Sequence, residues 1–410
     1  MAGASDKARF YLEQSVPELQ ELLRKKIFTK DEVSSIAKKR SDFEHTLNAR
    51  GSQPGDYARY AEYEMNLEAL RKKRVQRLGI KTGGHAGQRR IFFILDRGTR
   101  KFPGDLRLWM QCIEFARKEK ANKKLGEIMA AMLRLHPTKP DLWLYAAQYS
   151  LDAQADMTAA RSYMQRGLRF CAGQRLMWLE YAKLEMVYVA KVAARRRILG
   201  LDETRKEVVE TEDMLALPDV TAEDINPSLK DGVDDDALEK LAATPALTGA
   251  IPIAVFDEAM KKFHNDATLA EQFFDIIAEF DQTPATPTIL QHILDHLRNK
   301  QPESPSTTAC EFSLPLVGVE PTSAQFPAAL GDCLHAIRAG KRHKVEVAEK
   351  ALMRLLPFAL LDLDADIQTV ISATLVQQAK AIPADRLEKL STTLQKKRTK
   401  EAEHLAKLLS

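Results

Sequence analysis

The sequence predicts an all-α protein built as a right-handed superhelical solenoid of helix pairs. Three observations indicate this fold class. The three tryptophans, Trp109, Trp143 and Trp178, are spaced 34 and 35 residues apart. Proline recurs in phase with them, at Pro103 and Pro137. Between these landmarks apolar side chains recur every three or four residues, which is the spacing of one helix face. A repeat of this length is typical of stacked helix pairs.

Each tryptophan opens a window that we expect to form the first helix of a pair. Aromatic or apolar side chains follow three and six positions later, as in Trp109, Cys112 and Phe115. An earlier window begins at Tyr57. Because such residues share one side of a helix, we assign them to core packing rather than to stacking on nucleic-acid bases. The repeat-packing candidates are Tyr57, Tyr60, Tyr63, Trp109, Phe115, Trp143, Tyr149, Trp178, Tyr181, Pro103 and Pro137.

The second helix of each pair is expected within residues 91–98, 128–133 and 163–168, each ending shortly before a repeat boundary. The prolines stop the helix, and Asp105 and Asp141 follow as N-cap candidates for the next one. One pair buries only part of its apolar surface, so stacking of the next pair covers the remainder.

The repeat residues carry a resemblance of their own. The pattern Trp178-x-x-Tyr181-x-x-Leu184-Glu185 follows a helix that contains Arg166. It resembles the half-a-tetratricopeptide (HAT) repeat, which shares its period of about 34 with the tetratricopeptide repeat. HAT repeats are concentrated in RNA-processing assemblies, so the resemblance implies a role in one of them.

The first eighty residues carry a more specific resemblance. In strict order they contain FYLEQ at 10–14, VPEL at 16–19, IFTKDE at 27–32, KKRSDFE at 38–44, DYARYAEYE at 56–64 and LRKKR at 70–74. This run resembles the family of the sixth U-three snoRNA-associated protein, whose members are HAT-repeat subunits of the small-subunit processome. The resemblance extends to about residue 200 and is looser from about residue 251.

The family resemblance implies a nucleolar protein of the UtpB subcomplex that acts in early processing of small-subunit ribosomal RNA. It implies WD-repeat propeller subunits as partners of the N-terminal segment, with pre-ribosomal RNA and U-three snoRNA in the same particle. The partner-binding candidates are Phe10, Tyr11, Leu12, Leu19, Phe28 and Phe43.

The same N-terminal residues also predict helices without any family. Thr29 is a plausible N-cap, and Glu32 three residues later completes a capping box. Val33, Ile36, Ala37, Arg40 and Phe43 then fall on one face of the helix.

A basic block occupies residues 69–101. It holds eleven basic side chains against one acidic side chain, a net charge of +10. Such a block favours phosphate backbones and is compatible with nuclear import. The alternative is a solvated helix face that binds nothing. The RNA-proximal candidates are Arg71, Lys72, Lys73, Arg74, Arg77, Arg89 and Arg90.

The repeats, the charge pattern and the local composition together predict the domain organisation. We expect an N-terminal helical segment over residues 1–80 and a HAT-repeat array over 81–200. Residues 201–250 hold fourteen acidic and four basic side chains, which predicts a disordered linker rather than a calcium site. Residues 251–410 are expected to form a C-terminal helical HAT-like region with a loop near 301–327, where Pro, Ser and Thr are frequent.

Nothing in the sequence predicts an enzyme, a cofactor or a metal site. Gly83–Gly87 lacks the Lys-Ser/Thr of a phosphate loop, and His292 and His296 lack a third zinc ligand at a recognisable spacing. The four cysteines are scattered, which indicates a reducing compartment. Neither a signal peptide nor a membrane-spanning run is expected.

The prediction is therefore a non-catalytic scaffold of a nucleolar pre-ribosomal complex, needed for U-three snoRNA-dependent processing of ribosomal RNA. No membrane and no small-molecule substrate are expected among its partners. Two alternatives stay open. One is a HAT scaffold of the spliceosome or the 3′-end cleavage complex, and the other is a protein that binds RNA directly.

Overall fold

The computed structural model describes residues 4–80, 85–198, 248–340 and 343–409. Within these ranges every regular element is a helix. Each helix packs mainly against its neighbour or next neighbour along the chain. This arrangement confirms the predicted all-α helical-repeat fold, whereas the handedness of a superhelix stays a prediction. The chain divides into two compact units, residues 1–146 and 147–410.

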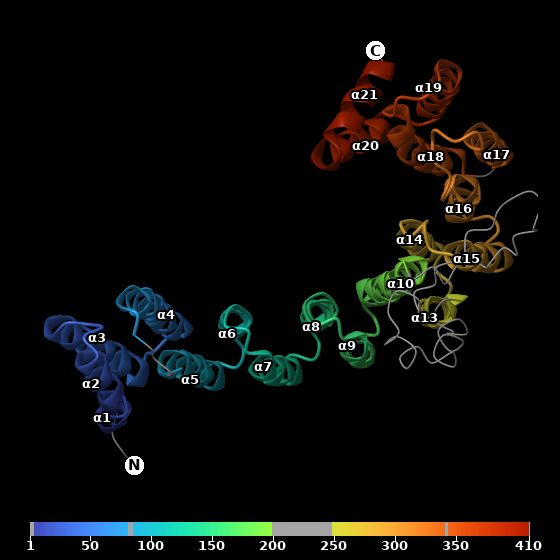
Figure 1. Ribbon diagram of the computed structural model, residues 1–410. Coiled ribbons are helices and arrows are strands. Elements are labelled where there is room, and N and C mark those ends of the chain that lie inside the picture. The colour runs from blue at the N-terminus through green and yellow to red at the C-terminus, as the bar shows by residue number, and fades with distance from the viewer. Residues whose placement is uncertain (1–3, 81–84, 199–247, 341–342, 410) are drawn as a thin grey trace, which may run out of the picture. The chain divides into compact units, whose positions relative to one another are not determined.

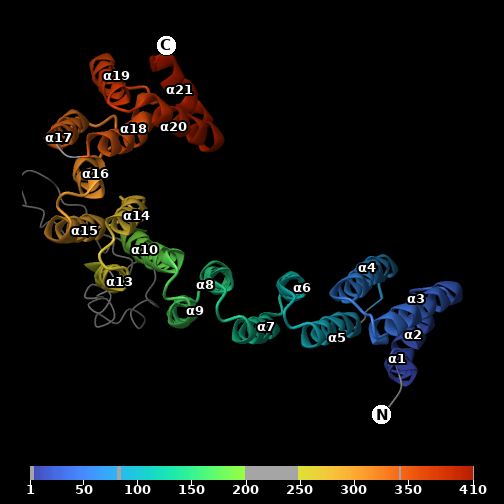
Figure 2. The same ribbon diagram turned by 180° about the vertical axis from the view of Figure 1, so that it is seen from behind.

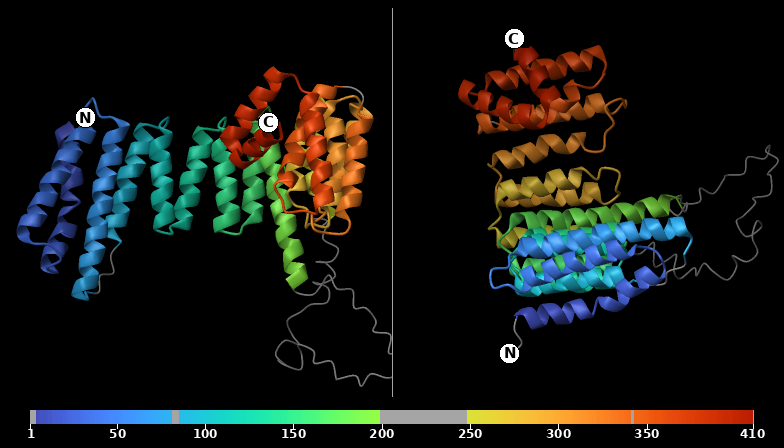
Figure 3. Two further views of the ribbon diagram at one scale, coloured as in Figure 1. Left: turned by 90° about the horizontal axis from the view of Figure 1, so that it is seen from above. Right: turned by 90° about the vertical axis from the view of Figure 1, so that its left-hand side faces the viewer.

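The helices of the first unit follow one another with short connections (Figures 1 and 2). They are α1 (Ala4–Glu13), α2 (Val16–Arg24), α3 (Lys30–Asn48), α4 (Pro54–Leu78), α5 (Ala86–Lys101), α6 (Leu106–Lys118), α7 (Asn122–Leu135) and the start of α8 (Pro140–Ala153). The helices α1 and α2 pack on α3, and α4 packs closely on α5. Figure 3 shows α4 to α7 standing side by side in a row.

The starts of two helices test the predicted caps. Thr29 and Glu32 form the capping box, because each side chain accepts a hydrogen bond from the other residue's backbone N–H, at 3.3 and 2.9 Å. Asp105 caps α6 by accepting bonds from two backbone N–H groups. The prediction for Asp141 is wrong, since α8 begins at Pro140 and Asp141 lies in its first turn. Proline suits the first helical position because its φ is preset and its missing N–H would be unpaired there.

The tryptophans explain the repeat more fully than apolar spacing does. Each indole Nε1–H donates a hydrogen bond to the backbone carbonyl six residues earlier. Trp109 bonds Pro103 at 3.0 Å, and Trp143 bonds Pro137 at 2.9 Å. In the second unit Trp178 bonds the carbonyl of Ala172 at 3.0 Å. The bond connects the turn after one helix to the buried face of the next helix. This contact explains why the prolines and the tryptophans recur with the same period.

The second unit continues from α8 through α-helices that range from 9 residues in α16 to 24 residues in α10 (Figures 1 and 2). They are α9 (Met157–Phe170), α10 (Arg175–Ile198), α13 (Ala250–Lys262), α14 (Ala267–Ala278), α15 (Thr286–Lys300), α16 (Pro305–Ser313), η3 (Leu314–Leu316), α17 (Phe326–Ala339), α18 (Lys344–Ala359), α19 (Ala365–Lys380), α20 (Ala384–Lys397) and α21 (Thr399–Leu409). The helix α10 packs against α13 and α14. The predicted linker, apart from its last three residues, lies outside the described residues.

The predicted loop at 301–327 is wrong over much of its length, because it contains α16 and η3. The Ser304 side chain caps α16 by accepting a bond from the Ser306 N–H, and Pro305 occupies the first helical position. The Ser/Pro composition therefore marks a helix start rather than a loop. Phe312 is fully buried in the core formed with α17, α18 and α19, and this packing stabilises so short a helix.

Candidate interaction surfaces

An exposed aromatic cluster joins α1 to α5. Phe10 is 56% exposed, and its ring meets Tyr11 edge-on. The Tyr11 ring lies 5.4 Å from that of Phe93, and the Arg97 guanidinium sits 4.0 Å from the Tyr11 centroid. We call Phe10, Tyr11, Phe93 and Arg97 the aromatic patch. Large aromatic rings beside an arginine are the side chains that dominate protein interfaces.

The other partner-binding candidates lie deeper. Leu19 and Phe28 are buried in a small core with Ile36. The Phe43 ring stacks on Tyr60 with centroids 4.9 Å apart. Leu12 is half-buried. Of the six candidates, Phe10 is therefore the one with most of its side chain free to meet a partner, while Leu19 and Phe28 contribute packing.

Sequence reasoning missed Phe93 as a surface residue. Its neighbour Phe92 packs against Phe115 of α6, with ring centroids 4.8 Å apart. Adjacent positions on a helix point about 100° apart, so both rings cannot enter the same core. The adjacent pair Phe92 and Phe93 in the sequence therefore indicated that one of the two rings would lie at the surface.

A network of ion pairs lies beneath the aromatic patch. The Arg40 guanidinium is 1% exposed and donates two hydrogen bonds to the Glu64 carboxylate, at 2.7 and 2.8 Å. Glu18 accepts bonds from both Arg40 and Arg90. Burial lowers the pKa of Arg40, but the attraction and hydrogen bonds of Glu64 outweigh it and raise the pKa overall. The network links α2, α3, α4 and α5.

A second buried carboxylate completes the network. Glu44 of α3 accepts two hydrogen bonds of 3.0 Å from Arg97. This ion pair anchors the arginine of the aromatic patch to α3. Burial raises the pKa of Glu44, and the Arg97 charge opposes that rise. The Arg97 side chain is thereby held in one geometry against the Tyr11 ring.

The basic block is far less positive in the fold than in the sequence. Acidic side chains from other parts of the first unit pair with five of its cations. The pairs are Arg71–Glu68, Lys72–Glu119, Arg74–Glu32, Arg90–Glu18 and Arg97–Glu44. All five acids lie outside residues 69–101 in the sequence, which is why counting charges within that window overstates the local field.

Five exposed cations of the block have no ion pair among the described residues. They are Lys73, Arg77, Arg89, Arg100 and Lys101, of which Lys101 donates hydrogen bonds to the Leu47 carbonyl and the Ser52 hydroxyl. Lys81 lies outside the described residues. Of the RNA-proximal candidates, Lys73, Arg77 and Arg89 thus keep an uncompensated charge, while Arg71, Lys72, Arg74 and Arg90 share theirs with a carboxylate. RNA proximity stays a prediction, and we expect any RNA contact to be made by Lys73, Arg77 and Arg89.

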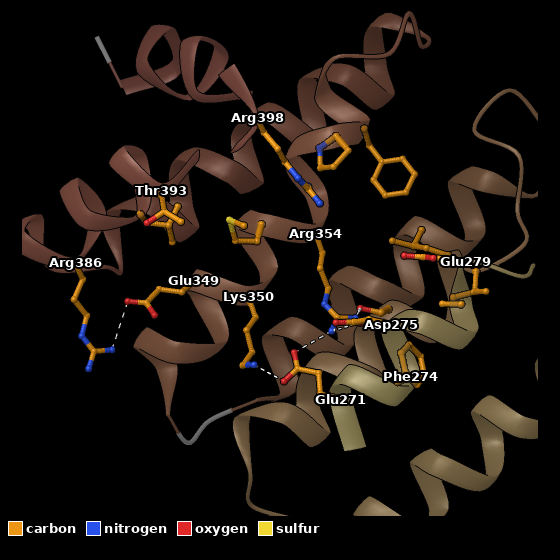
Figure 4. A pocket seen from close by; sticks show the side chains of 18 of the residues that line it. Glu271, Phe274, Asp275, Glu279, Glu349, Lys350, Arg354, Arg386, Thr393 and Arg398 are labelled. Carbon is orange, nitrogen blue, oxygen red and sulfur yellow. Dashed lines mark hydrogen bonds and ion pairs between the residues drawn. The ribbon is translucent and has the colours of Figure 1, made fainter. Parts of the chain in front are cut away.

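A groove opens in the second unit between α14, η3, α18 and α20 (Figure 4). Its cavity volume is about 1080 Å³. Side chains such as Phe274, Met353 and Leu390 form an apolar floor, and charged side chains from α14, α18 and α20 surround it. No sequence motif pointed to this groove, because it is assembled from helices far apart in the chain.

The cysteines and histidines serve local packing. The four thiols are buried and free, and burial raises the pKa of Cys112 and of Cys333 to about 12. Such thiols are protonated near neutral pH and weakly nucleophilic. His292 and His296 are not bare surface residues, since they hydrogen-bond Asp257 of α13 and Asn265 just beyond it.

Within residues 4–80, 85–198, 248–340 and 343–409, no group of three or more His, Cys, Asp or Glu side chains could hold a metal ion. None of the helices so described has the length and apolar character to cross a bilayer.

These features define a class: an α-helical repeat protein that presents an aromatic patch, unpaired cations and an apolar groove. Comparison with known proteins adds a sequence similarity. Residues 12–92, which run from α1 to α5, match the family model described as U3 small nucleolar RNA-associated protein 6. These residues include most of the N-terminal motifs that predicted the resemblance.

Several relatives carry this name or that of a homolog. The Schizosaccharomyces pombe protein is 33% identical over 302 residues, which is 71% of this chain and 57% of the relative. The Homo sapiens homolog is 29% identical over 44% of this chain and 31% of the relative. The Dictyostelium discoideum homolog is 24% identical over 67% of this chain and 46% of the relative.

The predicted resemblance is therefore confirmed: the chain is similar in sequence to U3 small nucleolar RNA-associated protein 6. The matched regions span between 31% and 57% of the length of these relatives. Assignment of the helix pairs to the HAT type stays a prediction.

Proposed function

We propose that the chain is a non-catalytic scaffold subunit of the small-subunit processome in the nucleolus. In this role it is needed for U-three snoRNA-dependent processing of the small-subunit ribosomal RNA precursor. The observation that carries the proposal is the family match over residues 12–92, which covers α2, α3 and α4 and ends beside the aromatic patch on α1 and α5. The helical repeats support a scaffold, because stacked helix pairs offer extended surfaces to macromolecules.

The proposed partners of the aromatic patch are the WD-repeat propeller subunits of the UtpB subcomplex. The patch suits a folded protein surface, since Phe10 is exposed while Arg97 is held by Glu44. A preorganised arginine and rigid rings lose little conformational freedom on binding. Pre-ribosomal RNA and U-three snoRNA would then lie in the same particle without direct contact being required.

Affinity purification of the tagged chain from nuclear extract tests the complex. We expect propeller-type processome subunits to co-purify at about 0.5 M salt, where exposed ion pairs are strongly screened. Recovery of splicing or 3′-end cleavage factors in their place would assign the chain to another RNA-processing machine. Recovery of RNA at low salt and of no protein at high salt would favour a direct RNA binder.

A matched pair of variants tests the surface. Phe10→Ala should reduce the recovery of propeller subunits, whereas Leu135→Ala should not. Both side chains are apolar and similarly exposed, at 56% and 52%, but Leu135 lies at the end of α7, outside the patch. Circular dichroism should show unchanged helix content for both variants. Equal recovery with Phe10→Ala and the unaltered chain would remove the patch from the proposal.

A further inference from the structure

The acidic residues on the α14 side of the groove already have partners. Glu271 accepts bonds from Lys350 and from Arg354, both on α18. Arg354 also lies 2.7 Å from the Asp275 carboxylate and donates to the Ser313 hydroxyl. Figure 4 shows Lys350 and Arg354 pointing at Glu271, with Arg354 also beside Asp275, and these ion pairs neutralise much of the charge of this wall. Glu279, just beyond α14, is exposed and lies 3.5 Å from Lys183, so the wall keeps a weakly paired carboxylate but offers no free cation to a ligand.

The opposite rim, on and beside α20, is different. Lys389 is exposed and has no ion pair among the described residues. Arg386 reaches Glu349 at 3.4 Å and Glu346 only at 4.0 Å, and Arg398 reaches Glu401 at 3.3 Å. The side chains of both arginines are half-exposed. The rim thus carries three cations whose charge is weakly compensated, above an apolar floor.

The floor argues for a peptide rather than a nucleic acid. Ala278, Leu316, Val317, Met353, Pro357 and Leu390 give it aliphatic surface, and the ring of Phe274 is fully buried. The ring of Phe358 is engaged with Phe326, at 5.6 Å between centroids. A phosphate backbone gains nothing from aliphatic surface, and single-stranded bases bind best on open aromatic faces. Leucine-like side chains of a helix, by contrast, fill such a groove.

We propose that this groove binds an acidic amphipathic helix of a protein partner. Apolar side chains of the helix cover the floor, and carboxylates on its flank pair with Lys389, Arg386 and Arg398. The charge surplus of the rim selects an acidic sequence over a basic one. This inference goes beyond the proposed scaffold function and does not depend on which assembly the chain joins.

The test uses the purified full chain and a synthetic probe. The probe is a fluorescein-labelled peptide of about 16 residues, which spans roughly four helical turns. It carries leucine at helical spacing and glutamate on its flanks. We expect saturable binding by fluorescence anisotropy, and the double variant Arg386→Glu/Lys389→Glu should weaken it about tenfold or more. The control Lys344→Glu, an exposed residue outside the groove, should leave the affinity unchanged.

A probe of opposite charge shows whether the double variant is still folded, because a misfolded variant would bind neither probe. A probe with lysine in place of glutamate should bind the double variant more tightly than it binds the unaltered chain. Met353→Ala should weaken both pairings, because it removes floor contacts common to them. Peptide affinity that is insensitive to the double variant would overturn the proposal. The proposal would also be overturned if the peptide did not bind and a single-stranded RNA oligonucleotide bound with an affinity that the double variant weakens.

Discussion

Arg40 illustrates what a single residue decides in this fold. Its spacing places it on the apolar face of α3 beside Val33 and Ile36, where a cation is unexpected. The structure resolves the conflict, because Glu64 of α4 meets it with two hydrogen bonds and both side chains are at most 2% exposed. A buried charge is tolerated only when a partner compensates for lost hydration.

Replacing Arg40 alone should therefore be severe. Arg40→Met leaves the Glu64 carboxylate buried without its cation, and we expect a loss of about 3–5 kcal/mol in unfolding free energy. Urea unfolding followed by circular dichroism measures the loss, and hydrogen exchange should place it in α3 and α4. The double variant Arg40→Met/Glu64→Leu should recover a large part of the stability. Equal losses in the single and double variants would contradict this account.

Glu32 makes a prediction about pH. Hydrogen bonds from Arg74, then from the Thr29 backbone, lower the pKa of Glu32 from 4.5 to about 2. A depressed carboxyl pKa stabilises the fold above pH 4.5, and this contribution is lost as the pH falls toward 2. The Glu32 side chain is 38% exposed, so solvent screening keeps the contribution below about 1 kcal/mol.

Carboxyl carbon NMR, assigned with Glu32→Gln, measures this pKa directly. Arg74→Met should return it most of the way to 4.5, because the largest cause is removed. Arg77→Met, three residues along the same helix, serves as the control and should leave it unchanged. A pKa near 4.5 in the unaltered chain would show that the ion pair does not persist in solution.

At the scale of the element, close approach between helices matters more than helix propensity. Gly98 of α5 faces Tyr57 of α4. A methyl group added there would lie 3.1 Å from the Tyr57 Cβ and Cγ atoms. Those atoms sit next to the backbone of a buried residue, so they cannot move aside without shifting α4. Glycine thus sets the spacing of this helix pair.

Gly98→Ala should consequently destabilise the chain by about 1–3 kcal/mol, although alanine favours helices. Gly126→Ala in α7 is the matched control. An added methyl group there meets no atom within 4 Å, so we expect stabilisation of about 0.5–1 kcal/mol. Thermal unfolding of both variants measures the difference. Two variants shifted in the same direction would show that the α4–α5 spacing can relax.

At the scale of the molecule, folding redistributes charge. The basic block carries +10 along the sequence, yet five of its cations meet carboxylates in the first unit. Surplus positive charge is concentrated instead at a few unpaired side chains. Any affinity of this unit for RNA should depend on those side chains rather than on the block as a whole.

The triple variant Lys73→Gln/Arg77→Gln/Arg89→Gln should accordingly weaken RNA binding. If each cation meets one phosphate of a single strand, the slope of log affinity against log salt should become shallower by about 2. Gel-shift titrations with a single-stranded oligonucleotide at several salt concentrations measure the slope. The control Lys72→Gln removes a cation that Glu119 already compensates, and it should change the slope little. An effect of Lys72→Gln as large as one third of the triple effect would contradict the distinction.

The sequence by itself determined the local features of this protein. Periodicity places most of the helices, Thr29 and Glu32 specify the start of α3, and the ordered N-terminal motifs predict the similarity to U3 small nucleolar RNA-associated protein 6. Each of these signals lies within one helix or one short run of residues, where backbone geometry links sequence spacing directly to position in space.

Only the tertiary structure decided which charges are compensated and where a groove opens. Glu18 and Arg90 are 72 residues apart, and Glu271 and Arg354 are 83 apart, yet each pair is in contact. The helix α16 also depends on tertiary structure. Its Ser- and Pro-rich start predicts a loop from the sequence, whereas the burial of Phe312 in the core stabilises a helix there. The physical reason is that burial and pairing depend on which helices pack together, and packing partners are not encoded in the spacing of any one segment.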